Sequence, residues 1–248
     1  MDALLQIENL HGGYTHKNVL HGISFDVYPK EIIGLIGLNG AGKSTTIKHV
    51  MGLMDPKKGQ VSVNGQTFQE NPKEYRNQIA YIPEMPILYE ELTLYEHLRL
   101  TAMAYGLSEK VFEERLPPLL KAFRLEKRLK WFPVHFSKGM RQKVMILCAF
   151  LIEPPLYVVD EPFVGLDPLG IQSYLDLMDE MKQNGAGVLM STHILATAEK
   201  YCDRFVILHE GEIRAKGSLD ELREQFNMRS ASLDDLYVQL TKEEDNYV

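Results

Sequence analysis

Long apolar segments are missing from this sequence. The longest uninterrupted apolar run extends only from Val144 to Ile152, far short of the roughly 20 residues that a membrane-spanning helix requires. The N-terminal residues form no basic leader and become polar early, so we expect no signal peptide. The chain is therefore expected not to cross a membrane by itself.

Cysteine is scarce, and basic residues are outnumbered. Cys148 and Cys202 have no paired or metal-ligand spacing, which fits a reducing cytoplasm and disfavours a disulfide scaffold or a zinc site. Lysine and arginine total 27 against 34 aspartate and glutamate residues, a net charge of −7. Proteins that neutralise many phosphates of DNA or RNA normally carry a basic excess. We therefore expect no nucleic acid partner.

Short apolar segments alternate with helical patterns along most of the 248 residues. Ile32–Ile36 and Leu156–Val159 are continuously apolar, which is typical of strands buried on both faces of a mostly parallel sheet. Leu4–Leu10 and Ile23–Tyr28 resemble half-buried strands, and Gln60–Val63 is expected to enter a hairpin. Further strands are expected at Ala186–Ser191, Arg204–His209 and Glu212–Lys216, and further helices at Pro168–Asn184 and Ile194–Cys202.

The middle of the chain is helical only. Helical spacing extends over Thr93–Tyr105 and Lys110–Arg124, and Ser137 is placed to cap a helix that continues to about Glu153. This block interrupts the alternation of strands and helices, so it is expected to be an inserted subdomain.

A glycine-rich loop carries the strongest chemical signal. The pattern Gly37-x4-Gly42-Lys43-Ser44 follows an apolar strand and precedes a helix expected from about Thr46, the context that a phosphate-binding P-loop requires. Its backbone N–H groups can bind β- and γ-phosphate oxygens, Lys43 adds a positive charge, and the Ser44 hydroxyl can hold Mg²⁺. The nucleotide-binding residues expected here are Gly37, Leu38, Asn39, Gly40, Ala41, Gly42, Lys43, Ser44 and Thr45.

Two consecutive carboxylates follow the second buried strand. Asp160 comes at the end of the apolar run, where it can reach a metal ion at the C-terminal edge of the sheet. Glu161 is placed to polarise an attacking water as a general base. Together with the P-loop, the pair predicts a nucleoside triphosphatase.

These patterns predict an α/β protein with a P-loop NTPase core and a mostly parallel sheet. An N-terminal antiparallel β subdomain and the inserted helical subdomain complete the expected fold. We assign residues 1–87 and 154–225 to the core, 88–153 to the helical subdomain, and 226–248 to a C-terminal helix with an acidic tail.

One further segment indicates the kind of triphosphatase. It is Phe136-Ser137-Lys138-Gly139-Met140-Arg141-Gln142. It lies 23 residues before Asp160, counted from Ser137, and it resembles the signature of the ATP-binding-cassette (ABC) ATPases. Further residues resemble motifs of this family. They occur in the same order as in the family and extend over nearly the whole chain. They are Tyr14 as the aromatic that stacks on adenine, Glu84 at the glutamine loop and near the metal, Gly165, Leu166 and Asp167 as the dimer-contact loop, and His193 as the switch histidine.

The resemblance implies that ATP and Mg²⁺ lie between two cassettes. One chain would supply its P-loop, and the other would contact the same ATP through Ser137, Lys138, Gly139 and Met140. A second copy of this chain is the favoured partner, with a sister subunit as the alternative. The resemblance further implies ATP hydrolysis and a separate transmembrane permease subunit at the cytoplasmic face of the membrane. The layout is most similar to bacterial exporter ATPases of the Ecs type.

Several residues depart from the family pattern, among them Val164, which stands where the dimer-contact loop often has serine. Lys138 and Met140 replace a glycine and a glutamine of the usual signature, and Glu84 replaces a glutamine. Lys43, Ser44, Asp160, Glu161 and His193 are all in place, so hydrolysis is expected. The alternatives are a non-transport ABC ATPase acting on ribosomes or DNA, and a regulatory module without turnover. The apolar segment Met85–Tyr89 either packs internally or faces the membrane subunit.

Overall fold

The chain folds around two β-sheets. The structure, a computed structural model, describes residues 2–14 and 17–245, with side chains described up to residue 240. A four-stranded antiparallel sheet has the order β2-β1-β4-β5, and a six-stranded sheet has the order β10-β9-β3-β8-β7-β6. The first sheet consists of β1 (Leu5–Gly12), β2 (Leu20–Val27), β4 (Lys58–Val63) and β5 (Gln66–Thr67).

The six-stranded sheet is parallel except at one edge. Its strands are β3 (Ile32–Ile36), β6 (Ile79–Ile82), β7 (Leu156–Asp160), β8 (Gly187–Thr192), β9 (Arg204–His209) and β10 (Glu212–Gly217). The last of them, β10, pairs antiparallel with β9. Every residue of β3, β7 and β8 is buried, as the continuous apolar runs predicted.

Successive side chains of the central strands enter different cores. Tyr157 and Val159 join the core that contains the helical block, whereas Leu156 and Val158 join the core shared with the antiparallel sheet. This follows from the strand geometry, which points alternate side chains to opposite faces. The six-stranded sheet therefore separates the two main cores.

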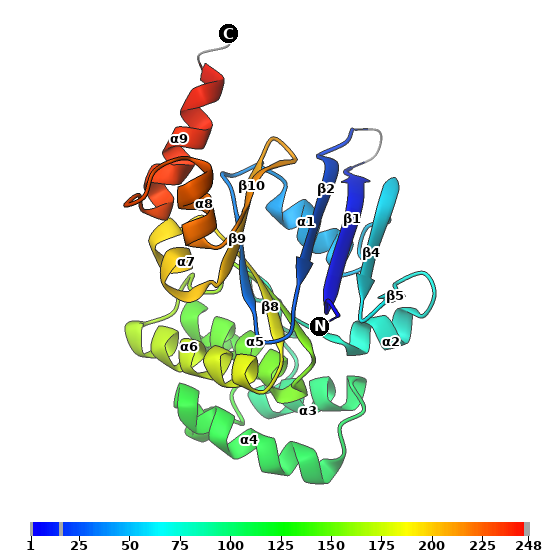
Figure 1. Cartoon of the computed structure of the whole chain (residues 1–248). Helices are drawn as coiled ribbons and strands as arrows, with labels where there is room; N and C mark the ends of the chain where they lie inside the picture. The colour runs from blue at the N-terminus through cyan, green and yellow to red at the C-terminus, as the bar shows by residue number, and fades with distance from the viewer. Residues whose placement is uncertain (1, 15–16, 246–248) are drawn as a thin grey trace.

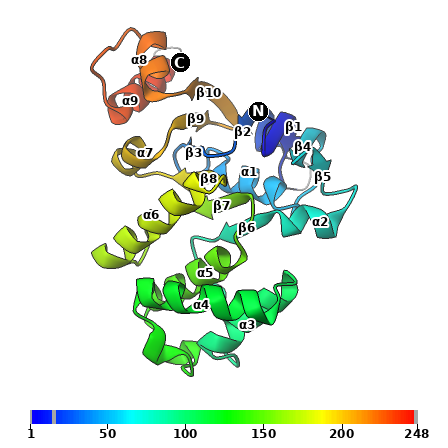
Figure 2. The same cartoon turned by 60° about the horizontal axis from the view of Figure 1, so that its bottom comes forward.

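Helices cover the sheet and extend beyond it (Figure 1). In Figure 2, α3, α4 and α5 form one group at one end of the molecule, and α8 and α9 lie at the opposite end. The helices are α1 (Lys43–Val50), α2 (Pro72–Asn77), α3 (Leu94–Ala104), α4 (Glu109–Phe123), α5 (Lys138–Ile152), α6 (Pro168–Gln183), α7 (Leu195–Tyr201), α8 (Leu219–Gln225) and α9 (Leu233–Asp245).

Most helices begin at a polar residue that caps them. Thr93 and Ser218 form complete capping boxes at α3 and α8, and Ser137 accepts a hydrogen bond from the Met140 N–H at the start of α5. Such caps satisfy backbone N–H groups that have no partner inside the helix. The expected helix boundaries of the central block are confirmed to within one residue.

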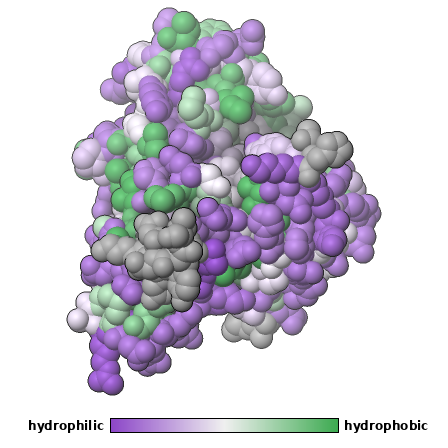
Figure 3. All heavy atoms as spheres, turned by 90° about the horizontal axis from the view of Figure 1, so that it is seen from above, coloured by the Kyte–Doolittle hydropathy of each residue, from purple (hydrophilic) through white to green (hydrophobic). Residues whose placement is uncertain are grey.

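The outer surface is mostly hydrophilic on the face shown in Figure 3, with apolar side chains gathered in small patches. Within the described residues, no helix is both long enough and apolar enough to span a bilayer. The division into units at 1–87 with 154–225, 88–153 and 226–248 stays a prediction. Residues 1, 15–16 and 246–248 of these units lie outside the described part.

Candidate functional site

The P-loop connects β3 to α1. Helix α1 begins at Lys43, three residues before the expected start near Thr46, because the backbone N–H of Thr46 already bonds to the Gly42 carbonyl at 2.8 Å. Gly40 and Gly42 have φ values of 87° and 112°, a left-handed backbone that strains other residues. No side chain caps α1. Its first-turn N–H groups are thus available to an anion, and the loop fits a phosphate.

Lys43 is buried against its own loop. The ammonium Nζ donates to the Gly37 carbonyl at 2.6 Å and lies 3.3 Å from the Leu38 carbonyl. Burial lowers the pKa of Lys43, whereas the carboxylates of Glu161, Asp160 and Glu84 act in the opposite direction. These carboxylates come from two separate segments of the chain. The Lys43 ammonium therefore lies close enough to these carboxylates for their charges to act on it.

A cavity of about 350 Å³ opens beside the P-loop. Tyr14 lines one side of it, half exposed, and its hydroxyl accepts a hydrogen bond from Lys48 Nζ at 2.8 Å. This bond, from α1, is the main reason that the pKa of Tyr14 is lowered. The aromatic ring is thus held next to the phosphate-binding loop, where the expected adenine contact requires it. The cavity is lined by Tyr14, Val19, Leu38, Asn39, Gly40, Gly42, Lys43, Ser44 and Thr45.

Asp160 lies at the C-terminal end of β7 and is buried. The Ser191 hydroxyl of β8 donates a short hydrogen bond to its carboxylate. Burial raises the pKa of Asp160, and the neighbouring carboxylates of Glu161 and Glu84 raise it further. A buried carboxylate that is destabilised in this way fits a divalent cation, which would offset the charge.

The site offers few protein ligands for a metal ion. Among residues 2–14 and 17–245, no group of three or more histidine, cysteine, aspartate or glutamate side chains could hold a metal ion. Mg²⁺ is usually held by one or two carboxylates together with substrate phosphates and waters. This pattern is matched by Asp160 and the exposed Ser44, together with the phosphates that the P-loop would bind.

Glu161 directly follows β7 in the left-handed region, with φ 47°. Its N–H bonds to the Ser191 carbonyl at 3.0 Å, which turns the buried side chain towards β8. Its carboxylate lies 2.7 Å from His193 Nδ1 and accepts a hydrogen bond from the Thr192 hydroxyl at 3.2 Å. The structure thus brings Glu161 and His193, both identified from the sequence, into direct contact.

The hydroxyls of Ser191 and Thr192 were missed as functional contributors. Both residues are fully buried at the end of β8. The parallel register that pairs Asp160 with Ser191 places these hydroxyls against the two carboxylates. A polar pair at the end of an apolar strand was the available signal, but it does not reveal which strand lies alongside.

The segment expected to be the signature packs against the loop Gly165–Asp167, which is expected to contact the second chain. A Cβ atom at Gly139 would lie 2.3 Å from the Gly165 carbonyl oxygen, so only glycine fits at this contact. Asp167 caps α6 by accepting from the Gly170 N–H at 2.9 Å, and it pairs with Lys143 of α5 at 3.1 Å. The Leu166 side chain packs partly buried against the core. The two segments therefore form one connected surface.

This surface is separate from the P-loop within one chain. Of the described residues, those that line the P-loop cavity do not include Ser137, Lys138, Gly139 or Met140. Ser137 caps α5, and both Ser137 and Lys138 are exposed at the N-terminus of this helix.

Glu84 follows β6 in an exposed loop. The preceding carbonyl, of Pro83, accepts a hydrogen bond from the buried Gln142 amide of α5 at 3.0 Å. Arg141 of the same helix forms a two-fold ion pair with Glu90, at 2.7 and 3.1 Å. The Glu84 loop is thus tied to the signature helix, a role for Gln142 that the sequence did not indicate.

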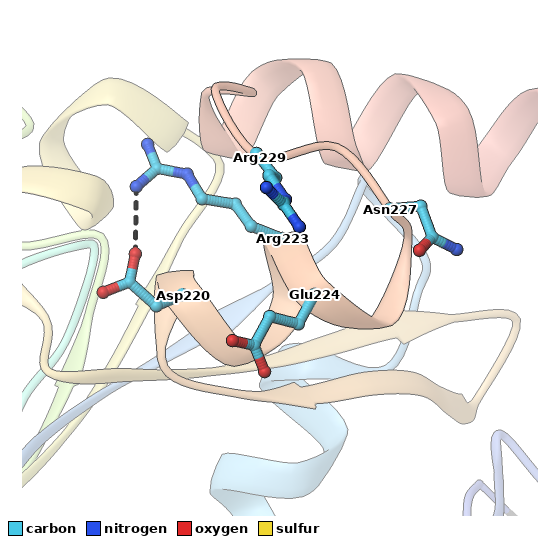
Figure 4. A pocket seen from close by; sticks show the side chains of 5 residues that line it. All are labelled: Asp220, Arg223, Glu224, Asn227 and Arg229. Carbon is cyan, nitrogen blue, oxygen red and sulfur yellow. Dashed lines mark hydrogen bonds and ion pairs between the residues drawn. The ribbon is translucent and has the colours of Figure 1, made fainter.

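A larger hollow of about 910 Å³ lies elsewhere, near the C-terminal helices. Figure 4 shows acidic and basic side chains around it, with Arg223 paired to Asp220 at 3.1 Å. It includes none of the P-loop or acidic residues described above. Size alone therefore does not mark the nucleotide site.

Comparisons with known proteins give a consistent picture. The model of the ABC transporter family matches residues 20–164. The chain is 67% identical over 242 residues to the ABC-type transporter ATP-binding protein EcsA of Bacillus subtilis strain 168, covering 98% of each. It is 32% identical over 216 residues to the Nod factor export ATP-binding protein I of Sinorhizobium fredii, covering 87% of this chain and 63% of that protein. A solved structure of the ATP-binding subunit of an ABC transporter superposes with a TM-score of 0.94 at 65% identity, over 96% of this chain and 99% of the other.

Proposed function

Because the chain belongs to the ABC transporter family and is an ATP-hydrolysing, ATP-binding subunit, we propose that two copies of it enclose two ATP molecules and drive a separate membrane-spanning subunit in export. The relative that is named for Nod factor export supports the direction of transport. We assign the chain to the cytoplasmic face of the membrane, as a peripheral subunit.

ATP is held in this proposal by the P-loop. The N–H groups at the start of α1 and the Lys43 ammonium bind its phosphate oxygens, and Tyr14 contacts the adenine. Ser44 and Asp160 would hold Mg²⁺, and Glu84 would add a carboxylate near it. When bound, the ion would supply positive charge to offset the charge that collects on the phosphate oxygens during hydrolysis.

Glu161 takes a proton from the attacking water. The Glu161 carboxylate directly follows Asp160 in the chain and is oriented by the Thr192 hydroxyl, which donates a hydrogen bond to it at 3.2 Å. His193 Nδ1 lies 2.7 Å from the same carboxylate and holds Glu161 in position. We expect His193 also to contact the γ-phosphate of ATP. One observation carries this proposed mechanism of hydrolysis. It is that Glu161, Asp160, His193 and Lys43 lie together at one edge of the sheet.

The proposed dimer completes each site. The N-terminus of α5, with Ser137, Lys138, Gly139 and Met140, would meet the partner's ATP, where the helix dipole favours an anion. Lys138 adds a positive charge at this end. Gly165, Leu166 and Asp167 would contact the partner across the same surface, because they are packed against the signature. Two identical chains are sufficient for this arrangement.

The membrane partner is proposed to dock next to the Glu84 loop. Met85, Ile87 and Tyr89 expose 66%, 81% and 62% of their surface, so the alternative that this segment packs internally is wrong for these side chains. Exposed apolar side chains that gather in one place are typical of protein–protein contacts. The loop is tied to α5 through Pro83 and Gln142, so that docking and the signature can move together.

Capture of the tagged chain from detergent-solubilised native membranes, followed by mass spectrometry, tests the transport proposal. A multi-spanning membrane protein in stoichiometric amount is the expected result. Ile87→Glu should lose this partner, whereas Leu53→Glu, at a 66% exposed side chain that follows α1 and is not part of the Glu84 loop, should keep it. Recovery of ribosomes or DNA in place of a membrane protein would overturn the proposal.

A further inference from the structure

A tyrosine of the last helix contacts the P-loop directly. Tyr237 lies in α9, 199 residues away from Leu38 in the sequence, and its hydroxyl accepts a hydrogen bond from the Leu38 N–H at 3.0 Å. The contact joins the C-terminal helix to the loop that binds phosphate.

The peptide unit between Gly37 and Leu38 is held at both ends. Its carbonyl, of Gly37, accepts the hydrogen bond from Lys43 Nζ at 2.6 Å, while its N–H donates to Tyr237. Because a peptide unit is planar, the orientation of the N–H fixes that of the carbonyl. Tyr237 therefore helps to determine where the Lys43 ammonium is held.

Gly37 leaves this peptide little freedom on its other side. A Cβ atom at Gly37 would lie 2.6 Å from the Leu208 carbonyl oxygen of β9 and 2.8 Å from the Ala41 side chain. The loop is thus packed closely against the sheet. A change at the Tyr237 hydroxyl would act on a peptide that is already confined.

Helix α9 is a rigid support for the hydroxyl. Leu233, Leu236 and Tyr237 are buried in a cluster with side chains of α7 and β9. The Leu233 N–H also donates to the Glu199 carboxylate of α7 at 2.7 Å. Burial raises the pKa of Tyr237, so the hydroxyl keeps its proton at neutral pH.

We propose that Tyr237 is a positioning residue for ATP binding, which acts by orienting the Gly37–Leu38 peptide and through it Lys43. Tyr237 is not among the residues that line the P-loop cavity, so its influence on ATP is expected to pass through the peptide that it bonds. The inference rests on the proposed nucleotide site and extends it to the C-terminal helix. Its consequence is that changes in the packing of α9 alter nucleotide affinity.

Tyr237→Phe tests the inference because it removes only the hydroxyl and keeps the buried ring. A neutral hydrogen bond is worth about 0.5–1.5 kcal/mol, so we expect the Kd for a non-hydrolysable ATP analogue and the KM for ATP to rise about two- to tenfold. The kcat should stay within about twofold of wild type, since reacting atoms are untouched. The melting temperature without nucleotide should fall by no more than a few degrees, as expected for the loss of one hydrogen bond, so the chain stays folded.

Tyr105→Phe is the matched control. The Tyr105 hydroxyl also donates to a backbone group, the Ile79 carbonyl at 3.1 Å, but at a distance from the P-loop in the fold. An equal rise in Kd for both variants, or an unchanged Kd for Tyr237→Phe with wild type binding normally, would overturn the inference alone. A wild-type chain that binds no ATP analogue would overturn the proposed nucleotide site and this inference with it.

Discussion

Replacing Glu161 with glutamine tests the proposed general base while keeping the shape of the side chain. The Glu161 carboxylate has two neighbours, His193 Nδ1 at 2.7 Å and the Thr192 hydroxyl at 3.2 Å. The Thr192 hydroxyl accepts a hydrogen bond from the Ile194 N–H and donates its own proton to the Glu161 carboxylate, which can only accept. The glutamine carbonyl can accept that proton, which leaves the amide facing His193.

The histidine can adapt to this change. A neutral imidazole that carries its proton on Nε2 presents Nδ1 as an acceptor, so both hydrogen bonds survive. The loss of a carboxylate also removes part of what raises the pKa of Asp160. We therefore expect the free energy of unfolding to change by no more than about 1 kcal/mol, which shifts the melting temperature by about 2–4 °C in a chain of this size.

Turnover should respond much more strongly than stability. Loss of a general base typically reduces the rate about 10²- to 10⁴-fold, which corresponds to about 2.7–5.4 kcal/mol in the activation barrier. Steady-state phosphate release and thermal unfolding on the same preparation measure the two effects separately. Nucleotide binding should remain close to wild type, because the P-loop is unchanged.

Glu153→Gln is the control for this experiment. Glu153 is also a glutamate in the left-handed region, with φ 51°, but it pairs with Arg115. Its replacement should leave turnover near wild type. A Glu161→Gln chain with turnover within about threefold of wild type would refute the assignment of Glu161 as base.

The other two predictions concern the metal and the thiols. Glu84→Gln should raise the Mg²⁺ concentration needed for half-maximal ATPase activity, because it removes a carboxylate that acts on both Asp160 and Lys43; an unchanged Mg²⁺ dependence, equal to that of the exposed control Glu91→Gln, would contradict it. Burial raises the pKa of Cys148 to about 11 and that of Cys202 to about 12, so at pH 8 at most about one thiol in a thousand is ionised. Both cysteines are partly exposed, but with so little thiolate both thiols should react with a disulfide reagent much more slowly in the native chain than in the unfolded chain; equal labelling rates for native and unfolded chain would contradict the raised pKa values.

Local pattern in the sequence was sufficient for the phosphate loop and for most strands, although β6 (Ile79–Ile82) was not predicted. The continuous run Ile32–Ile36 is β3 to the residue, and β7 extends the run from Leu156 by one residue to Asp160. These predictions succeeded because burial on both faces leaves a direct trace in the residue types. The start of α1 was placed three residues late, because loop and helix share the Gly42 peptide. Helix α2, only six residues long, gave no pattern that was recognised.

By itself, the sequence determined which residue types can bind phosphate, hold a metal ion and accept a proton, since these follow from glycine spacing and from carboxylates at strand ends. Only the tertiary structure decided which of them have neighbours. The strand order puts β8 between β3 and β7, and this alone places Ser191 and Thr192 against Asp160 and Glu161. The contact between Tyr237 and Leu38 likewise arises where α9 packs beside the P-loop. Contacts of this kind depend on which apolar surfaces of distant segments pack together. The hydrophobic pattern of one segment does not specify its partner.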